Sequence, residues 1–302
     1  MFEQRLAKRT KHLKKFAKKW PTDAFRVYDR DIPEYPWTVD FYGDHLLLQY
    51  FETRTSEGQT ETIPDICAEL LEIPKKNVHL KVRRRRSGTQ HEKLAAKKLE
   101  FEVFEDDHKF LVNLDDYIDT GLFLDHRNMR REAARLVKEH PSRRPDVLNL
   151  FSYTGAFSVW CAAAGAKVTS VDLSNTYQDW AERNFKLNKL DPAKHLFERS
   201  DATRWLPQAR VKDAYDLIIL DPPTWSRSKR MDTDFDIQRD HVFLLKHCVR
   251  LLRPGGTLLF STNLTSFKLD KENSPMELEE TTQWSVPEDF RSGIHRSFKG
   301  TK

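Results

Sequence analysis

The fold is decided by one stretch of sequence, which begins with DVLNLFSYTG at residues 146–155 and ends with DLIILDPPT at residues 216–224. In both segments a short apolar run stops at a polar loop, which is typical of a strand buried on both faces. Two segments between them, KVTSVD at 167–172 and HLFERSD at 195–201, also end in an acid. Helical patterns separate the four. They predict an α/β, Rossmann-like, doubly wound parallel sheet with its ligands at the carboxyl ends of the strands.

The composition is that of a globular chain with a real core. Its 302 residues allow about two domains. Hydrophobic residues make up 38%, while the 32% of charged residues indicates a polar surface. Apolar runs all stay well below the ~18 residues that a membrane span needs, and the N-terminus lacks the apolar core of a secretory signal. We therefore expect no membrane partner.

The cysteines are three in number and far apart, at Cys67, Cys161 and Cys248. An odd, scattered set favours neither a disulfide framework nor a metal cluster. We predict a protein without a metal, in the reduced cytoplasm.

Positive charge is concentrated in two places, although the net charge is only +5. Residues 1–20 hold eight Lys and Arg against one acid, and residues 81–86 read KVRRRR. This asymmetry favours a partner with a phosphate backbone, whereas the simpler interpretation is a solvated helix face and a surface loop. The candidate RNA-binding residues are Lys8, Lys11, Lys15, Arg83, Arg84, Arg85, Arg86, Lys229 and Arg230.

The first part of the chain predicts a helix followed by a small α+β domain. In residues 2–20, Leu6, Leu13, Phe16, Ala17 and Trp20 fall near one helix face. This apolar stripe is narrow, which favours docking on the protein body over binding to a membrane surface. We therefore expect a basic N-terminal helix at 1–22 and an RNA-binding domain at 23–118.

Residues 119–302 are expected to form the second domain, around the sheet described above. A turn at 253–256 should lead into a fifth strand. The patterns predict helices at 126–139, 156–164, 175–188, 202–209 and 235–252, and a last strand pair at 281–286 and 294–298.

The loop after the first strand of this domain contains a single glycine, Gly155. A glycine there lets a ligand approach closely, but one glycine is not a dinucleotide fingerprint. An ordinary strand–helix turn remains an equal alternative at this point.

Acids end the next two strands, at Asp172 and Asp201. A carboxylate at the end of the second strand can accept hydrogen bonds from a ribose diol, and the next can accept from an exocyclic amine. A single acid in such a place is more often a helix cap. Two at successive strand ends favour a nucleoside pocket.

The most specific motif is Asp221-Pro222-Pro223-Thr224-Trp225. Two prolines after a buried strand fix the backbone and leave carbonyls free to accept from the amino group of a planar base. Trp225 can stack on that base. The alternative is a rigid turn with a core tryptophan, but the acid directly before the prolines favours a site.

Residues 145–262 resemble class I S-adenosylmethionine-dependent methyltransferases, and the Asp-Pro-Pro motif resembles that of enzymes that methylate nucleobase nitrogens. The stretches DTGLFLDHR (119–127), LNLFSYTG (148–155), DPPTWSRSKRM (221–231) and FDIQRDH (235–241) are similar to the RlmK part of the fused bacterial 23S rRNA methyltransferases RlmKL. Trp225 stands where we expect Phe. This resemblance covers nearly the whole chain and implies an enzyme that forms N7-methylguanosine in 23S rRNA.

The resemblance also implies S-adenosyl-L-methionine as the cofactor and a role for each matching residue. Asp172 would bind the ribose and Asp201 the adenine, while Asp221 would lie beside the sulfonium and the target base. The implied cofactor-binding residues are Thr120, Phe123, Arg127, Asn149, Phe151, Ser152, Tyr153, Gly155, Asp172, Asp201 and Asp221, and the catalytic ones are Asp221, Pro222, Pro223 and Trp225.

Three other functions stay open. A cytosine-C5 methyltransferase of the related RlmI type needs a cysteine after the fourth or fifth strand, and this chain has none there. A non-catalytic RNA-binding or ribosome-assembly factor would not need the acids. A small-molecule N-methyltransferase would not need the basic segments. Whether a helper opens the rRNA structure is left open as well.

Overall fold

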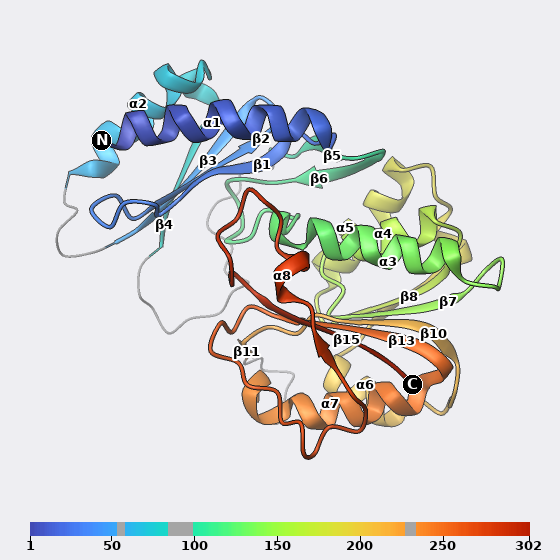
Figure 1. Cartoon of the computed structure of the whole chain (residues 1–302). Coiled ribbons are helices and arrows are strands. Elements are labelled where there is room, and N and C mark those ends of the chain that lie inside the picture. Colours follow the sequence, from blue (N-terminus) through green and yellow to red (C-terminus); the bar gives the residue numbers. More distant parts are fainter. Residues whose placement is uncertain (53–57, 84–98, 227–233) are drawn as a thin grey trace. The chain divides into compact units, whose positions relative to one another are not determined.

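The computed structural model describes residues 1–52, 58–83, 99–226 and 234–302 (Figure 1). The chain forms two compact units. The first contains Met1–Leu124 and Glu288–Arg291, and the second contains Asp125–Pro287 and Ser292–Lys302. We expected a boundary at residue 118 and a separate N-terminal helix. In the structure that helix belongs to the first unit, and a short late segment returns to the same unit.

The first unit packs two helices on a four-stranded sheet with the strand order β1-β2-β3-β4. The first three strands are antiparallel and the fourth runs parallel to β3. A two-stranded hairpin follows. The elements are α1 (Phe2–Lys19), β1 (Ala24–Asp29), β2 (Trp37–Tyr42), β3 (His45–Phe51), α2 (Gln59–Leu71), η1 (Lys75–Asn77), β4 (Val78–Arg83), β5 (Phe101–Glu105) and β6 (His108–Val112).

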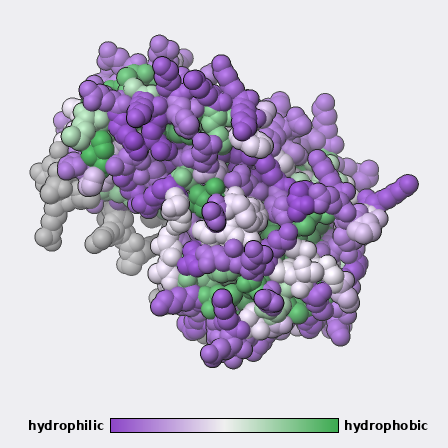
Figure 2. All heavy atoms as spheres, in the orientation of Figure 1, coloured by the Kyte–Doolittle hydropathy of each residue, from purple (hydrophilic) through white to green (hydrophobic). Residues whose placement is uncertain are grey.

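Helix α1 forms because its apolar residues recur on one face. Phe2, Leu6, Leu13 and Phe16 are buried and belong to the core of the first unit, as the spacing predicts. Trp20 was expected on this face, but it follows the helix and is 41% exposed. Hydrophilic side chains cover most of the outer surface seen over this helix (Figure 2).

The second unit contains a seven-stranded sheet with the order β14-β15-β13-β10-β7-β8-β9. The five strands from β13 to β9 are parallel, while β15 and β14 are antiparallel additions at one edge. This confirms the predicted fold class. The strands are β7 (Asp146–Leu150), β8 (Lys167–Asp172), β9 (Leu196–Arg199), β10 (Tyr215–Leu220), β13 (Leu252–Thr262), β14 (Glu279–Glu280) and β15 (Arg296–Thr301).

Helices cover both faces of this sheet, with α3, α4 and α5 on one side and α6 and α7 on the other (Figure 1). The apolar residues of β7, β10 and β13 pack with α6 and α7 in one core cluster. The remaining elements are η2 (Leu124–His126), α3 (Arg127–Glu139), α4 (Ala156–Ala163), α5 (Asn175–Leu187), η3 (Pro192–Lys194), α6 (Ala202–Gln208), β11 (Trp225–Ser226), β12 (Phe235–Asp236), α7 (Ile237–Leu251) and α8 (Thr282–Ser285).

Two predictions for the later part of the chain were wrong. Residues 253–256 are not a separate turn but lie inside β13, where the pairing with β10 shifts register between Tyr215 and Leu217. The strand expected at 281–286 is helix α8 instead. Its hydroxyl groups bond to neighbouring side chains, with Ser285 Oγ bonded to His295 Nε2 and to Ser297 Oγ.

The strand order reverses beside β7, because β8 and β9 lie on one side of it and β10 and β13 on the other. In open α/β sheets, ligands bind at the carboxyl ends of the strands next to such a switch point. The loop after β7 and the residues that follow β8, β9 and β10 therefore share one edge of the sheet.

Candidate functional site

The loop after β7 has an unusual backbone. Phe151 and Tyr153 have φ angles of 57° and 50°, and Gly155 has 76°. Non-glycine residues in this left-handed region cost energy and concentrate at functional sites. A Cβ on Gly155 would lie 2.8 Å from the Cβ of Ala181, so only glycine fits between the loop and α5. The backbone of the loop can thus be approached closely by a ligand and by α5.

Ser152 supplies a polar atom to this loop. Its backbone N–H donates to the carbonyl of Val171 at 3.0 Å, which ties the loop to β8. Its hydroxyl is buried and has no hydrogen-bond partner among the described residues. Buried polar groups are nearly always hydrogen-bonded, so this oxygen fits a ligand that completes it.

Asn149 lies below the loop, inside the fold. It is 1% exposed, and its amide donates to Ser158 Oγ on α4 at 2.9 Å, while Ser158 in turn bonds to Ser170 of β8. We predicted a cofactor-binding role for Asn149. Its described contacts hold β7, α4 and β8 together beneath the loop, and its cofactor-binding role stays a prediction.

Asp172 ends β8 and connects two loops. Its carboxylate accepts from the N–H of Tyr153 at 2.8 Å and from the N–H of Ser174 at 2.8 Å. Burial raises the pKa of Asp172 to about 6, although the two backbone hydrogen bonds act in the opposite direction. The carboxylate is thereby fixed beside the β7 loop at the sheet edge.

Asp201 follows β9, and its two carboxylate oxygens have different surroundings. Its Oδ1 caps α6 by accepting from the N–H and the hydroxyl of Thr203 at 2.9 and 2.7 Å. Its Oδ2 is buried and has no hydrogen-bond partner among the described residues. This second oxygen can accept from a ligand amine while the first caps the helix.

Asp221 follows β10 and begins the Asp-Pro-Pro loop. Its Oδ1 accepts from the Ser261 hydroxyl at 2.6 Å, and its Oδ2 lies 3.5 Å from Nε2 of His126. Pro222 is buried, whereas Trp225 is 43% exposed. The predicted alternative, a core tryptophan, is therefore wrong, and Trp225 offers an exposed ring beside the loop.

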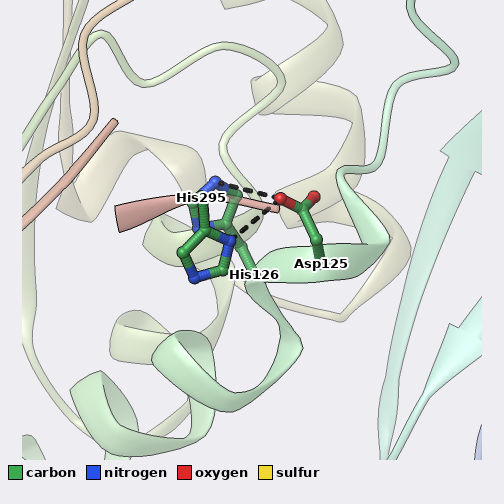
Figure 3. A group of neighbouring side chains, drawn as sticks. All are labelled: Asp125, His126 and His295. Atoms are coloured by element: carbon green, nitrogen blue, oxygen red, sulfur yellow. Dashed lines mark hydrogen bonds and ion pairs between the residues drawn. The ribbon is translucent and has the colours of Figure 1, made fainter. Parts of the chain in front are cut away.

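Three residues that we did not predict lie together, namely Asp125, His126 and His295 (Figure 3), and His126 connects the group to Asp221. Their candidate ligand atoms lie within 4.8 Å of one another, so the group is one that could hold a metal ion. The Asp and His directly before Arg127 were a local signal that we overlooked. His295 carried no such signal, because it comes 170 residues after Asp125.

The other predicted residues fall in different places. Arg127 is fully buried at the start of α3. Thr120 and Phe123 belong to the first unit. The Thr120 hydroxyl bonds to Tyr42 and to the carbonyl of Leu122. The cofactor contacts of both residues stay predictions.

The candidate RNA-binding residues divide into three groups. Lys8, Lys11 and Lys15 are exposed on α1, as expected. Arg83 is bound to its own unit, because it donates to Gln49 and to the carbonyl of Ile118. The rest lie outside the described residues, namely Arg84, Arg85, Arg86, Lys229 and Arg230.

Comparison with known proteins decides the family. A family model described as S-adenosylmethionine-dependent methyltransferase matches residues 39–286.

The chain belongs to this family of S-adenosylmethionine-dependent methyltransferases. Its match to a solved putative methyltransferase, SMU.776 complexed with SAH, covers 100% of this chain and 81% of that one, at 25% identity and a TM-score of 0.80. This confirms both the predicted cofactor and the fold.

Curated relatives narrow the resemblance further. Ribosomal RNA large subunit methyltransferase K of Neisseria meningitidis serogroup B is 43% identical over 99% of this chain and 86% of its own length. Ribosomal RNA large subunit methyltransferase K/L of Pseudoalteromonas atlantica is 44% identical over 96% of this chain, which spans 42% of that relative. The predicted similarity to RlmK is confirmed, and the chain spans less than half of the K/L relatives that it matches.

The residues of the site fit S-adenosylmethionine. The buried oxygens of Ser152 and Asp201 that lack partners in the described structure are acceptors for polar groups of a ligand, and Gly155 allows close approach. In the described residues none of the helices is long and apolar enough to cross a membrane.

Cysteine chemistry finds no support in this methyltransferase. Cys161 and Cys248 are free but fully buried, and burial raises the pKa of Cys161 to about 12 and that of Cys248 still further. A C5 methyltransferase needs a thiolate that reaches the base, whereas these thiols are protonated and enclosed by the core.

Proposed function

We propose that this methyltransferase forms N7-methylguanosine in 23S rRNA. The observation that carries the proposal is the extended match to methyltransferase K of N. meningitidis, over 86% of that relative. The site supports it, because an acid and two prolines follow the strand next to the switch point and an exposed Trp225 lies beside them.

We assign the cofactor contacts from the loops at the sheet edge. Asp172 would accept hydrogen bonds from the ribose hydroxyls, and Oδ2 of Asp201 would accept from the adenine amine. Phe151, Ser152 and the backbone around Gly155 would hold the methionine part. When bound, S-adenosylmethionine supplies an electrophilic methyl group on a positively charged sulfur.

Guanine N7 suits a site without a general base. Its lone pair lies in the plane of the base and carries no proton, so the residues of the site need not remove one, and bound S-adenosylmethionine would supply the methyl group. The residues must therefore align the base and exclude water, which is catalysis by positioning. Trp225 would stack on the guanine, and the carbonyls at Pro222 and Pro223 would accept from its amino group.

Charge is the second contribution of the site. The positive charge begins on the sulfur and ends on the methylated guanine. The Asp221 carboxylate would lie beside both positions and would offset the charge throughout the transfer. A helper that opens the rRNA structure and a cytoplasmic location remain part of the proposal.

The test is a mass map of methylated nucleotides in 23S rRNA from cells with and without the gene. We expect the RNA from cells without the gene to lack one methyl group on a guanine. At that position, borohydride and aniline should cleave the RNA chain only when the gene is present. Restoring the gene should restore the methyl group, while restoring an Asp221→Ala variant should not. An unchanged map would refute the proposed substrate, and full activity of Asp221→Ala would refute the proposed site.

A further inference from the structure

The Asp221 carboxylate has two neighbours from distant parts of the chain. Ser261, on β13, donates to Oδ1 at 2.6 Å. His126, directly before α3, places Nε2 at 3.5 Å from Oδ2. The histidine is 1% exposed, so this contact is enclosed by protein. The two neighbours bracket the acid on both of its oxygens.

The ring of His126 is itself held in place by His295 (Figure 3). The two imidazoles stack with their centroids 4.7 Å apart and their planes only 8° from parallel. His295 is fixed at both ring nitrogens, because Nδ1 lies 3.1 Å from Asp125 Oδ2 and Nε2 lies 2.9 Å from Ser285 Oγ. A chain of contacts thus runs from Ser285 of α8 through the rings of His295 and His126 to Asp221.

This geometry favours a polar support over a metal centre. An imidazole binds a metal through a lone pair in the plane of its ring. Two stacked, nearly parallel rings direct their lone pairs along separate planes, so a single ion cannot lie in both planes. In addition, both nitrogens of His295 already have hydrogen-bond partners.

We propose that His126, held by His295, is a positioning residue that fixes the Asp221 carboxylate for methyl transfer. The inference rests on the proposed role of Asp221 beside the sulfonium. A carboxylate free to rotate would lose part of its alignment with the moving charge, and misplacement by about 1 Å can cost on the order of 100-fold in rate.

The charge state of His126 agrees with this role. The groups that face it are Asp221, Asp125, His295 and Arg130. Burial lowers the pKa of His126 below its ordinary value of 6.5, so the ring is neutral at pH 7. A neutral ring can orient the acid without cancelling the negative charge that faces the sulfonium.

The test is a double-mutant cycle between His126→Phe and Asp221→Asn. Phenylalanine keeps a ring against His295 and removes both nitrogens. The measurements are the single-turnover rate at saturating S-adenosylmethionine, on 23S rRNA from cells that lack the gene, and the Kd for SAH. His195→Phe is the matched control, because His195 is a hydrogen-bonded histidine of the same unit and lies directly before β9.

We expect His126→Phe to lower the rate by about 10- to 100-fold while the Kd for SAH changes little. In the Asp221→Asn background the same substitution should cause no further loss, because the group that it positions is gone. The control should keep its rate. If His126→Phe lowers the melting temperature strongly, His126→Asn, which retains a donor, should restore part of the rate.

Several outcomes would overturn the inference. A wild-type rate for His126→Phe would remove the positioning role. An equal loss in both backgrounds would show a merely structural role. If the purified protein contains a stoichiometric metal ion and the His126→Phe variant lacks it, the group is a metal centre and not a polar support. Full activity of Asp221→Asn would instead refute the proposed site itself, so the two failures are distinguishable.

Discussion

If Asp172 binds the ribose as proposed, we expect cofactor binding to be sensitive to acid. The pKa of its buried carboxyl is about 6 in the folded chain, well above its ordinary value of 3.8. The protonated acid is therefore favoured by folding, and this contribution to stability is present below about pH 4 and is lost as the pH rises through about 6. The proposed ribose contact would need the ionised carboxylate instead, because the hydroxyls of a ribose diol donate best to that form.

We expect the affinity for SAH to fall by about tenfold for each pH unit below about 6. Calorimetric titration between about pH 5 and about pH 7.5 measures this. In Asp172→Asn the affinity should be lower and nearly independent of pH over the same range. An equally steep pH dependence in that variant would assign the titration to another group.

Gly155 should tolerate no side chain. Gly155→Ala would place a methyl group 2.8 Å from the Cβ of Ala181 at a φ of 76°. Gly255 has a similar φ of 79° but no atom within 4 Å of an added Cβ, so Gly255→Ala isolates the backbone strain. We expect Gly155→Ala to lower the free energy of unfolding by about 1–3 kcal/mol more than the control, measured by urea denaturation. Equal losses would show that α5 moves aside.

The acids of the site could be predicted from the sequence because each follows its own strand. Asp172, Asp201 and Asp221 lie at or just after the ends of predicted strands, and parallel strands bring such ends to one edge. His126 and His295 could not be found in this way. Their stacking depends on how β15 and α8 return to the start of α3, which no local pattern shows.

At the scale of elements, the exposed face of α1 offers a test for RNA binding. Lys8, Lys11 and Lys15 are exposed on it, while its apolar face is buried in the first unit. Replacing all three by Gln should weaken binding to 23S rRNA. The slope of log K against log salt should become shallower by about 0.7 to 0.9 for each lost phosphate contact.

A matched variant separates the effect of where the lysines lie from the effect of the net charge on RNA affinity. Lys138, Lys186 and Lys246 are also exposed, on α3, α5 and α7 of the second unit, and replacing them by Gln removes the same charge. This variant should keep more of the affinity, and both variants should bind SAH like the wild type. Equal losses would show that only the total charge matters.

The helices of the second unit were largely predictable from their patterns, with the exception of α8. Helices α1, α3, α4 and α5 begin and end within a few residues of the expected positions. Helix α8 spans only Thr282–Ser285, which is too short for a helical pattern to show. The irregular part of β13 contains Pro254 and two glycines, residues that otherwise mark turns.

At the scale of the whole molecule, residues 288–291 join the first unit although their neighbours belong to the second. The carboxylate of Asp289 is fully buried and accepts from the N–H of Arg26 at 3.0 Å, and its carbonyl accepts from Arg9 at 3.2 Å. The Arg26 guanidinium lies over the ring of Phe290. These contacts make the late segment part of the first unit's structure.

We expect Asp289→Ala to destabilise the first unit by about 1–3 kcal/mol, because it leaves the partly buried N–H of Arg26 without its acceptor. Hydrogen exchange should show faster exchange at Arg26 and along β1 while β7 and β10 keep their protection. Glu288→Ala is the control, since Glu288 is exposed and its side chain bonds to the exposed His12. Faster exchange throughout both units would mean that they unfold together.

The late segment also sets an order of events during synthesis. A ribosome releases the residues of α1 and β1 long before residues 288–291, because translation proceeds from the N-terminus. Until then Arg26 lacks its partners from Asp289 and Phe290. The packing of the nascent N-terminal part therefore stays incomplete until nearly the entire second unit has been synthesised.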